Sequence, residues 1–387
     1  MLWGCATQQQ ATPPPAPQQS APPVTTVEPL PPPLPEGPIR VGLLLPLTGD
    51  AAGVGADMLD AAQLALFDVG DSDLVLLPRD TSGTPEGAAA AARDALDNGA
   101  KLLLGPLFSS ATQAVAPLAV ARNVRVLSFS NDAAAAGKGA YILGFRPEEQ
   151  VERIVDFAHR QGLARVAALV PDDAYGARAL RAWRTASTAT PGIAAGPSAT
   201  YPASGDASDA VRRLTVADPR GAAGPSPFDA LLLADAGARL DAVLGLLGFH
   251  GVAPGQARLL GTMLWQDDPA TLAAPALRGA WMATVPPDGV STFARHFEDN
   301  FGRKPGPLAG LAYDATALAA VLARSERRLD DEALTAPAGF SGRLGIFRLL
   351  PNGLTEHGLS VVEIGGGTTR LLDPAPSAFT PGLAAGY

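Results

Sequence analysis

The segment KLLLGPLFSSATQ, residues 101–113, predicts how this chain folds. Its apolar run at residues 102–104 is typical of a parallel strand covered on both faces, and the Gly-Pro pair that follows ends the strand. Ser109 or Ser110 can then cap a helix that continues to residue 121. In open α/β sheets, a turn at the carboxyl end of a parallel strand is where ligands bind, and the free N–H groups of a helix start favour a carboxylate. The same residues also fit a routine turn closed by a serine cap.

Strands and helices alternate on both sides of this segment. The alternation predicts parallel sheets with right-handed crossovers, and its restart near residue 147 predicts two lobes of similar construction. A glycine run at 365–367 between two apolar segments predicts a hairpin, and residues 218–227 are expected to form a flexible insertion. The expected strands are 39–47, 74–77, 102–104, 124–127, 141–145, 166–170, 228–233, 258–260 and 280–285, and the expected helices are 58–69, 84–96, 109–121, 149–160, 177–187 and 238–249.

Composition limits the classes of function. The chain has 387 residues, of which 47% are hydrophobic and 17% charged, enough for two domains with their own cores. Its net charge of -9, without a cluster of Lys or Arg, argues against a nucleic-acid partner. His159, His250, His296 and His357 belong to no metal-spaced pair, and Cys5 is the only cysteine. We therefore expect no enzyme activity, no cofactor and no metal site.

The first residues contain a possible processing signal. The tetrapeptide Leu2-Trp3-Gly4-Cys5 resembles the end of a bacterial lipoprotein signal, in which a small residue precedes the cysteine that is cleaved and acylated. Residues 1–5 are interpreted as the remnant of such a signal, with Cys5 as the lipidation site, or as a chance match, because the charged and apolar regions that should precede the cysteine are missing. Ala6 stands where an aspartate would signal inner-membrane retention, so the resemblance implies a periplasmic protein anchored to the outer membrane.

Residues 6–38 consist mainly of Pro, Gln, Ala, Ser and Thr. This composition cannot bury a core, and we expect a disordered linker in extended polyproline II conformation that spans on the order of 100 Å when fully stretched. Such a linker is an inert spacer or, behind a lipid anchor, a tether that lets the folded part work away from the membrane. No other segment has the roughly 18 uninterrupted apolar residues of a membrane-spanning helix.

Short motifs over residues 38–372 resemble, in order and spacing, the type I periplasmic binding proteins of the leucine/isoleucine/valine-binding family. The resemblance implies two doubly wound parallel-sheet lobes, joined by a three-crossover hinge that closes around a ligand. It places lobe 1 at 38–146 plus 270–326 and lobe 2 at 147–269 plus 327–373, before a tail at 374–387. The matching motifs are VGLLLPLTG at 41–49, LLGPLFSSAT at 103–112, VLSFS at 126–130, GFRP at 144–147, VPDDAYG at 170–176, FDALLL at 228–233, AYDA at 312–315 and FSGRLGIF at 340–347.

The resemblance also implies a set of ligand-binding residues. Family members hold the carboxylate and amino groups of an amino acid with a serine turn and a strand end, and an aromatic residue of the second lobe closes over the ligand. Tyr175 also fits the simpler role of a cap for the helix that begins near Gly176. The matching residues here are Ser109, Ser110, Ser128, Ser130, Asn131 and Tyr175.

Two departures count against an amino-acid ligand. Many family members offer an acidic residue to the ligand ammonium in the stretch that matches 261–265, and here no acidic residue comes before Asp267. A buried ammonium without an acceptor is costly. Asp267 and Asp268 can substitute, or they can form a solvated loop and helix cap, while Trp265 can line the cleft with an apolar face. The first loop, 49–55, offers no aromatic ring where some relatives have one.

Two functions remain open from the sequence. The chain resembles solute receptors that bind a small polar, amino-acid-like or carboxylate ligand and pass it to an ABC permease, and the serine turn and Tyr175 favour this function. It also resembles the penicillin-binding protein activators, outer-membrane lipoproteins that bind and stimulate a peptidoglycan synthase. The opening LLLPLTG motif, the absent acidic partner and the long tether favour that alternative.

Overall fold

The computed structural model describes Met1, Gly4 and residues 37–70, 73–189, 195–203, 206–215, 227–252, 255–325 and 327–379. From Pro38 onward these residues belong to one compact unit. The predicted lipidation site Cys5, linker residues 6–36, tail residues 380–387 and most of the predicted insertion at 218–227 lie outside the described residues. Among those described, no helix is both long and apolar enough to cross a membrane.

The first lobe is built on a five-stranded parallel sheet of order β2-β1-β3-β4-β5. Its strands are β1 (Ile39–Leu45), β2 (Leu74–Asp80), β3 (Leu102–Leu104), β4 (Arg125–Ser128) and β5 (Ala140–Ile142). Its helices are α1 (Ala52–Val69), α2 (Pro85–Asp97), α3 (Ser109–Val120), α9 (Pro287–Phe301) and α10 (Ala309–Ser325).

Strand β3 has the two covered faces that its sequence predicts. Leu102 and Leu104 pack in the core cluster that contains residues of α1 and α10, whereas Leu103 packs in the cluster of α2 and α3. All three leucines are fully buried, because successive side chains of a strand point to opposite faces and each face carries a helical layer. The central apolar run therefore fixes a three-layer arrangement of helices, sheet and helices.

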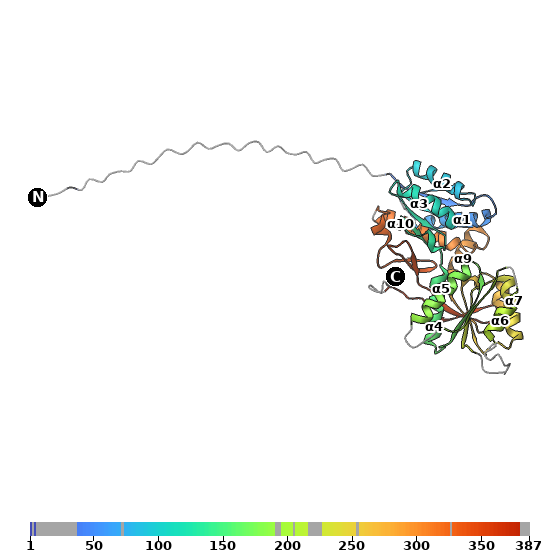
Figure 1. Ribbon diagram of the computed structural model, residues 1–387. Helices are drawn as coiled ribbons and strands as arrows, with labels where there is room; N and C mark the ends of the chain where they lie inside the picture. Colours follow the sequence, from blue (N-terminus) through green and yellow to red (C-terminus); the bar gives the residue numbers. More distant parts are fainter. Residues whose placement is uncertain are drawn as a thin grey trace. The chain divides into compact units, whose positions relative to one another are not determined.

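The second lobe contains a seven-stranded sheet of order β15-β14-β10-β9-β8-β6-β7. Helices α4 and α5 cover one face of it, and α6 and α7 cover the other (Figure 1). The last two strands form the predicted antiparallel hairpin at one edge. Its strands are β6 (Val166–Asp172), β7 (Ser198–Pro202), β8 (Ala230–Leu233), β9 (Arg258–Gly261), β10 (Trp281–Thr284), β14 (Ser360–Ile364) and β15 (Thr369–Asp373), and its helices are α4 (Pro147–Arg160), α5 (Ala174–Ala189), α6 (Ser208–Thr215), α7 (Gly237–Phe249) and the short α8 (Pro269–Ala273).

The predicted boundary of the first lobe at residue 270 is wrong. Strand β10 pairs with β9 and β14 of the second sheet, and Leu272 and Leu277 pack in the core of the second lobe. Residues 270–285 therefore belong to the second lobe, because β10 fills a place between two strands of that sheet. Strand β7 and helix α6, which were not predicted, also belong to this lobe.

The predicted return to the second lobe at residue 327 is also wrong. Helix α11 (Asp331–Leu334) and the antiparallel sheet of β11 (Phe340–Gly342), β12 (Gly345–Leu349) and β13 (Thr355–His357) follow α10. Leu334 and Phe347 are buried in the core of the first lobe. The carboxylate of Asp331 pairs with Arg125 at 2.6 Å. The residues that follow α10, up to about residue 357, thus belong to the first lobe.

Within the described residues, the chain crosses between the lobes three times, before α4, after β10 and before β14, which confirms the predicted two-lobe architecture. The first and third crossovers are tied together. The Nδ1 atom of His357 lies 3.0 Å from Glu149 Oε1, and its ring packs on Phe145 with centroids 4.5 Å apart. Arg146 also donates a 3.2 Å hydrogen bond to the carbonyl of Thr355. This hinge therefore has a packed polar core.

Candidate functional site

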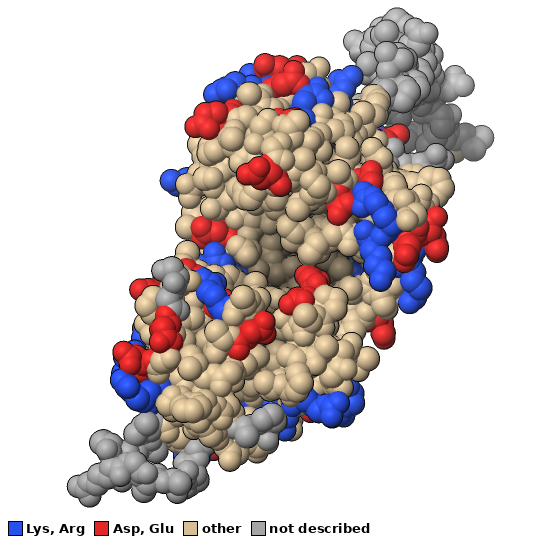
Figure 2. Space-filling view, turned by 90° about the vertical axis from the view of Figure 1, so that its right-hand side faces the viewer, with Lys and Arg blue, Asp and Glu red and all other residues tan. Residues whose placement is uncertain are grey.

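A cavity of about 1010 Å³ lies between the two lobes. Figure 2 shows it as a hollow near the middle of the face, with mainly uncharged residues on its visible walls and charged side chains around its edges. The walls come from the ends of β3 and β4, from the hinge, from the start of α5, from the turn after β9, and from the segment around α9. Such a volume is at the upper end of the range for cavities that hold small organic ligands.

The turn between β3 and α3 forms part of the first lobe's wall. Leu107, Phe108 and Ser109 line the cavity there. Gly105 allows the turn, since its φ of +92° is a left-handed conformation and a Cβ atom would lie 2.2 Å from the carbonyl oxygen of Leu44. The predicted strand, break and helix are thus placed at the cavity.

The predicted serine cap of α3 is wrong. The N-cap residue is Phe108, whose extended backbone (φ -95°, ψ 146°) precedes the first helical residue, Ser109, and no side chain caps the helix. The helix starts one residue earlier than a serine cap requires. Ser109 lines the cavity, but Ser110 is exposed and does not. The first-turn N–H groups of α3 therefore have no side-chain cap.

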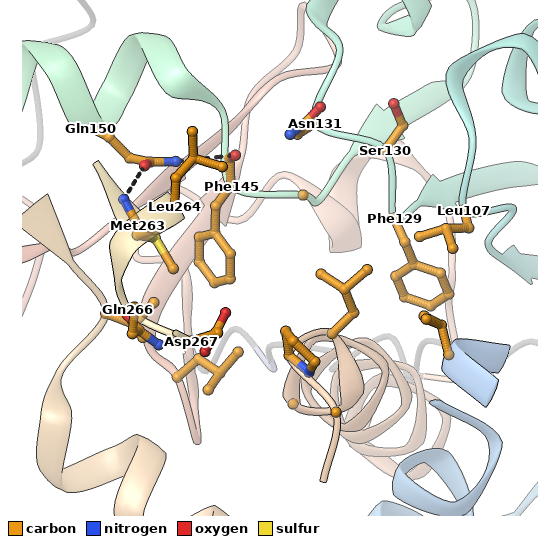
Figure 3. A pocket seen from close by; sticks show the side chains of 18 of the residues that line it. Leu107, Phe129, Ser130, Asn131, Phe145, Gln150, Met263, Leu264, Gln266 and Asp267 are labelled. Atoms are coloured by element: carbon orange, nitrogen blue, oxygen red, sulfur yellow. Dashed lines mark hydrogen bonds between the residues drawn. The ribbon is translucent and has the colours of Figure 1, made fainter. Parts of the chain in front are cut away.

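The strand end after β4 is divided between structural and lining residues. Ser128 is fully buried and does not line the cavity, because its hydroxyl lies 2.6 Å from that of Thr112 and 3.1 Å from the carbonyl of Pro106. Ser130 and Asn131 do line it (Figure 3). Of the three predicted residues in this segment, Ser128 thus has a structural role behind the cavity wall, whereas Ser130 and Asn131 face the cavity.

Tyr175 lies in the first turn of α5 and lines the cavity from the second lobe. Its hydroxyl donates a 3.0 Å hydrogen bond to Thr262 of the same lobe. Burial raises the pKa of Tyr175 to about 12, so the phenol stays protonated. The alternative role as a helix cap is not observed, since the N–H of Gly176 is bound by the carboxylate of Asp173 at 2.8 Å.

Gln150 is a cavity residue that the sequence analysis missed. Its side chain is 2% exposed in α4 and joins two walls of the cavity. The Oε1 atom accepts a 2.8 Å hydrogen bond from the N–H of Met263, and Nε2 donates to the carbonyls of Phe145 and Arg146, each at 3.2 Å (Figure 3). Its signal in the sequence is a polar residue on the buried side of a helix.

The turn after β9 brings an acidic side chain to the cavity. Asp267 lines it, and Figure 3 shows its carboxylate directed toward the open space. Desolvation by the surrounding wall raises the pKa of Asp267, although a hydrogen bond to Gln266 opposes this. Asp268 is instead the N-cap of α8, where it accepts a 3.0 Å hydrogen bond from the N–H of Ala270. Asp267 is exposed in this turn, so the predicted solvated-loop role holds for it beside its place at the cavity wall, and the predicted cap role holds for Asp268.

The sequence allows Trp265 to line the cleft, but in the structure this residue does not line the cavity. It is fully buried, and its Nε1 atom donates a 3.0 Å hydrogen bond to the carbonyl of Asp235. Other rings take the apolar role: Phe129, Phe145 and Phe293 line the walls. The cavity thus combines a mainly apolar lining with a few polar groups, an arrangement that suits a ligand with an apolar body and a small polar head.

Comparison with known proteins agrees with this architecture. A family model described as "Periplasmic binding protein" matches residues 38–367, and the chain belongs to this family. Members of the family are substrate-binding proteins of the periplasm, and the predicted resemblance is confirmed.

Two solved structures share the fold. One, assigned as a branched-chain amino acid ABC transporter of Rhodospirillum rubrum, is 20% identical with a TM-score of 0.74, and the match covers 87% of this chain and all of that one. The other is a solute-binding protein of an ABC transporter from Rhodopseudomonas palustris BisB5 in complex with 3,4-dihydroxybenzoic acid, 20% identical with a TM-score of 0.63 over 89% of this chain and 98% of that one. At this identity the likeness concerns the fold.

One curated relative also matches part of the sequence. An uncharacterised protein of Rickettsia prowazekii (strain Madrid E) is 29% identical over 120 residues, which is 31% of this chain. The match spans about a third of that protein's length, 32%.

Proposed function

We propose that this protein is a non-catalytic substrate-binding protein for ABC-type uptake, and that its cleft binds a small ligand with an apolar body and an amino-acid-like or carboxylate head. The observation that carries this proposal is the cavity of about 1010 Å³, whose walls come from both lobes and the hinge. A ligand held by two lobes around a hinge stabilises the closed state, which is how a binding protein of this architecture would signal that it is loaded.

The polar head would bind where the two lobes offer complementary groups. The carboxylate would contact Ser109, Ser130 and Asn131 and the uncapped start of α3, where N–H groups and the helix dipole favour an anion. An ammonium group, where the ligand has one, would contact Asp267, which supplies the acidic partner that the 261–265 stretch lacks. Tyr175 would cover the apolar body. Ser110 and Ser128 are left out of the contacting set because neither lines the cavity.

The relatives support two classes of ligand. The Rhodospirillum rubrum structure is assigned to branched-chain amino acid transport, and the Rhodopseudomonas palustris structure contains an aromatic acid. Branched-chain amino acids and the aromatic acid both combine an apolar body with a carboxylate. The aromatic and aliphatic lining described above accommodates either.

Thermal-shift measurements with branched-chain amino acids and with hydroxybenzoates test this function. A ligand present at about 100 times its dissociation constant stabilises the folded state by ~2.7 kcal/mol, which is readily measured as a rise in melting temperature. A rise that is lost in Asp267→Asn for amino acids, but kept for hydroxybenzoates, would identify the ammonium contact. No shift with any compound of either class would contradict the receptor function.

We also propose that Cys5 carries a lipid and that residues 6–38 tether the folded part in the periplasm, on the outer membrane rather than the inner one. The support is the Leu-Trp-Gly-Cys sequence, Ala6 and the Pro/Gln composition. Metabolic labelling with a fatty-acid probe checks the anchor, with Cys5→Ser in the full-length protein as the control. Equal labelling of the two proteins would refute it.

The long tether and the LLLPLTG motif favour a second function, that of a penicillin-binding protein activator. In this case the folded part would bind a peptidoglycan synthase and stimulate it. A pull-down with a purified penicillin-binding protein, together with an absence of ligand-induced stabilisation, would favour this function over the receptor.

A further inference from the structure

Arg178 connects the two lobes across the cavity. It lies on α5 of the second lobe, one turn after Tyr175, and its side chain is 13% exposed. The Nη2 atom donates a 3.0 Å hydrogen bond to the carbonyl of Asn131 in the first lobe, and Nη1 lies 3.5 Å from the Asp132 carboxylate. Both Arg178 and the segment that it contacts line the cavity.

The two ends of this connection are fixed within their own lobes. The N–H of Asp132 donates to the hydroxyl of Ser130 at 3.1 Å, and the Asp132 carboxylate accepts a 3.0 Å hydrogen bond from the N–H of Ala134. On the other side, the Nε atom of Arg178 lies 3.3 Å from Glu148 in the first turn of α4. A movement of either lobe is therefore transmitted to the guanidinium group.

The position of Arg178 distinguishes it from the hinge contacts. The pairs formed by Glu149 with His357 and by Arg146 with Thr355 lie where the chain crosses between the lobes, so they can persist while the lobes rotate. The contacts of Arg178 with residues 131 and 132 lie on the cavity walls and must break when the cleft opens. Opening would leave the guanidinium with its contact to Glu148 of the same lobe.

We propose that Arg178 is a latch that holds the cleft closed before any ligand arrives and so raises the affinity for the ligand. The inference extends the proposed function, because it concerns closure of the same cleft. The apparent affinity of a binding protein is its intrinsic affinity multiplied by the fraction of molecules in the binding-competent state. A larger closed population therefore raises the apparent affinity. Because Arg178 contacts protein groups of both lobes and needs no ligand to do so, the closed population is raised in the ligand-free protein as well.

Arg153 provides a matched control. Its side chain is 18% exposed, and it too donates to one carbonyl, that of Leu359 at 2.9 Å, and to one carboxylate, that of Asp373 at 2.8 Å. Arg153 lies on α4 and Asp373 ends β15, both in the second lobe, and Leu359 directly precedes β14 of that lobe at the end of the third crossover. Arg153→Ala therefore removes the same kinds of contact without touching the contacts of Arg178 with the first lobe.

The test measures the distance between the lobes in the ligand-free, full-length protein. Spin labels are attached at Gln63→Cys in the first lobe and at Asp241→Cys in the second, with Cys5→Ser to remove the native thiol. Pulsed electron–electron double resonance then reports the distance between the labels. We expect mainly the closed distance in the parent protein. In Arg178→Ala, the closed-to-open ratio should fall by about tenfold, the effect of losing one hydrogen bond from a charged group to a carbonyl oxygen. Arg153→Ala should match the parent.

Asp132→Asn provides a second route to the same answer, because it weakens the latch from the first lobe and does not depend on the folding of the arginine variant. It should also increase the open population. A parent protein that is already open without ligand would overturn the proposal. So would closed distributions in both latch variants, or an equal shift in Arg153→Ala. None of these outcomes depends on a ligand being found, so failure of the latch is distinguishable from failure of the receptor function.

Discussion

The pH dependence of stability should be controlled in part by Asp314, a 5% exposed residue of α10. Its carboxylate accepts hydrogen bonds from the N–H groups of Arg343 at 2.6 Å and Leu344 at 3.0 Å, and Leu344 lines the cavity. Burial raises the pKa of Asp314 from 3.8 to about 6, although these backbone hydrogen bonds oppose the rise. The folded state therefore favours the protonated form.

The sign of the effect follows from this direction. Because the folded-state pKa of Asp314 lies above the unfolded value, its contribution to stability is fully present below pH 3.8 and is lost as the pH rises through about 6. The difference between the two pKa values corresponds to ~3 kcal/mol of unfolding free energy. Asp314→Asn removes this titration and keeps one acceptor for the turn.

Urea unfolding, followed by tryptophan fluorescence at several pH values between 3.5 and 8, measures the difference. The unfolding free energy of the parent protein should fall relative to that of Asp314→Asn by ~3 kcal/mol over this range. Asp241→Asn, at an exposed position of α7, serves as the control and should keep the parental dependence. Parallel pH curves for the parent and Asp314→Asn would refute the reasoning.

Three further substitutions, with Ser110→Ala as a control, test the walls of the cavity and the residues that hold the walls in place. Gln150→Ala leaves the N–H of Met263 without its acceptor and should lower the unfolding free energy by about 1–3 kcal/mol, measured by urea unfolding, and weaken ligand binding. Ser128→Ala should cost about 1–2 kcal/mol because its hydroxyl is bonded in the core, whereas Ser110→Ala at the exposed surface should be neutral; equal melting temperatures would contradict this difference. Gly105→Ala places a Cβ atom 2.2 Å from a backbone oxygen at a φ of +92°, so circular dichroism should show a loss of about 3 kcal/mol, and an unchanged melting curve would show that the turn can adapt.

The sequence predicts those features that short-range chemistry determines. The apolar run at Leu102–Leu104 predicts a doubly covered strand, and the structure places these residues in the middle of the first sheet with a helical layer on each side. The cavity-lining positions of Ser109, Ser130, Asn131 and Tyr175 could also be expected, because parallel strands place their carboxyl ends at one edge of the sheet.

Long-range pairing determines the features that the sequence did not predict. Whether β10 joins the first or the second sheet depends on its partners β9 and β14, which an apolar run alone does not specify. Strand β7 alternates exposed and buried residues at an edge, so it has no continuous apolar run. Gln150 belongs to the cavity because its side chain contacts Met263, far away in the sequence, and it lies in no motif that predicts this.

The core of the first lobe combines strands β1 to β5 with α10, α11 and β12, so its two parts are separated in the chain by nearly the whole second lobe. During synthesis and export, the face of the first sheet that α10 covers must stay open to solvent until the last quarter of the chain has emerged. The second lobe has most of its strands by then. Strands β14 and β15 of that lobe emerge later still, so neither lobe is complete at that point, and we expect C-terminal truncation before α10 to release an aggregation-prone product rather than a free-standing first lobe.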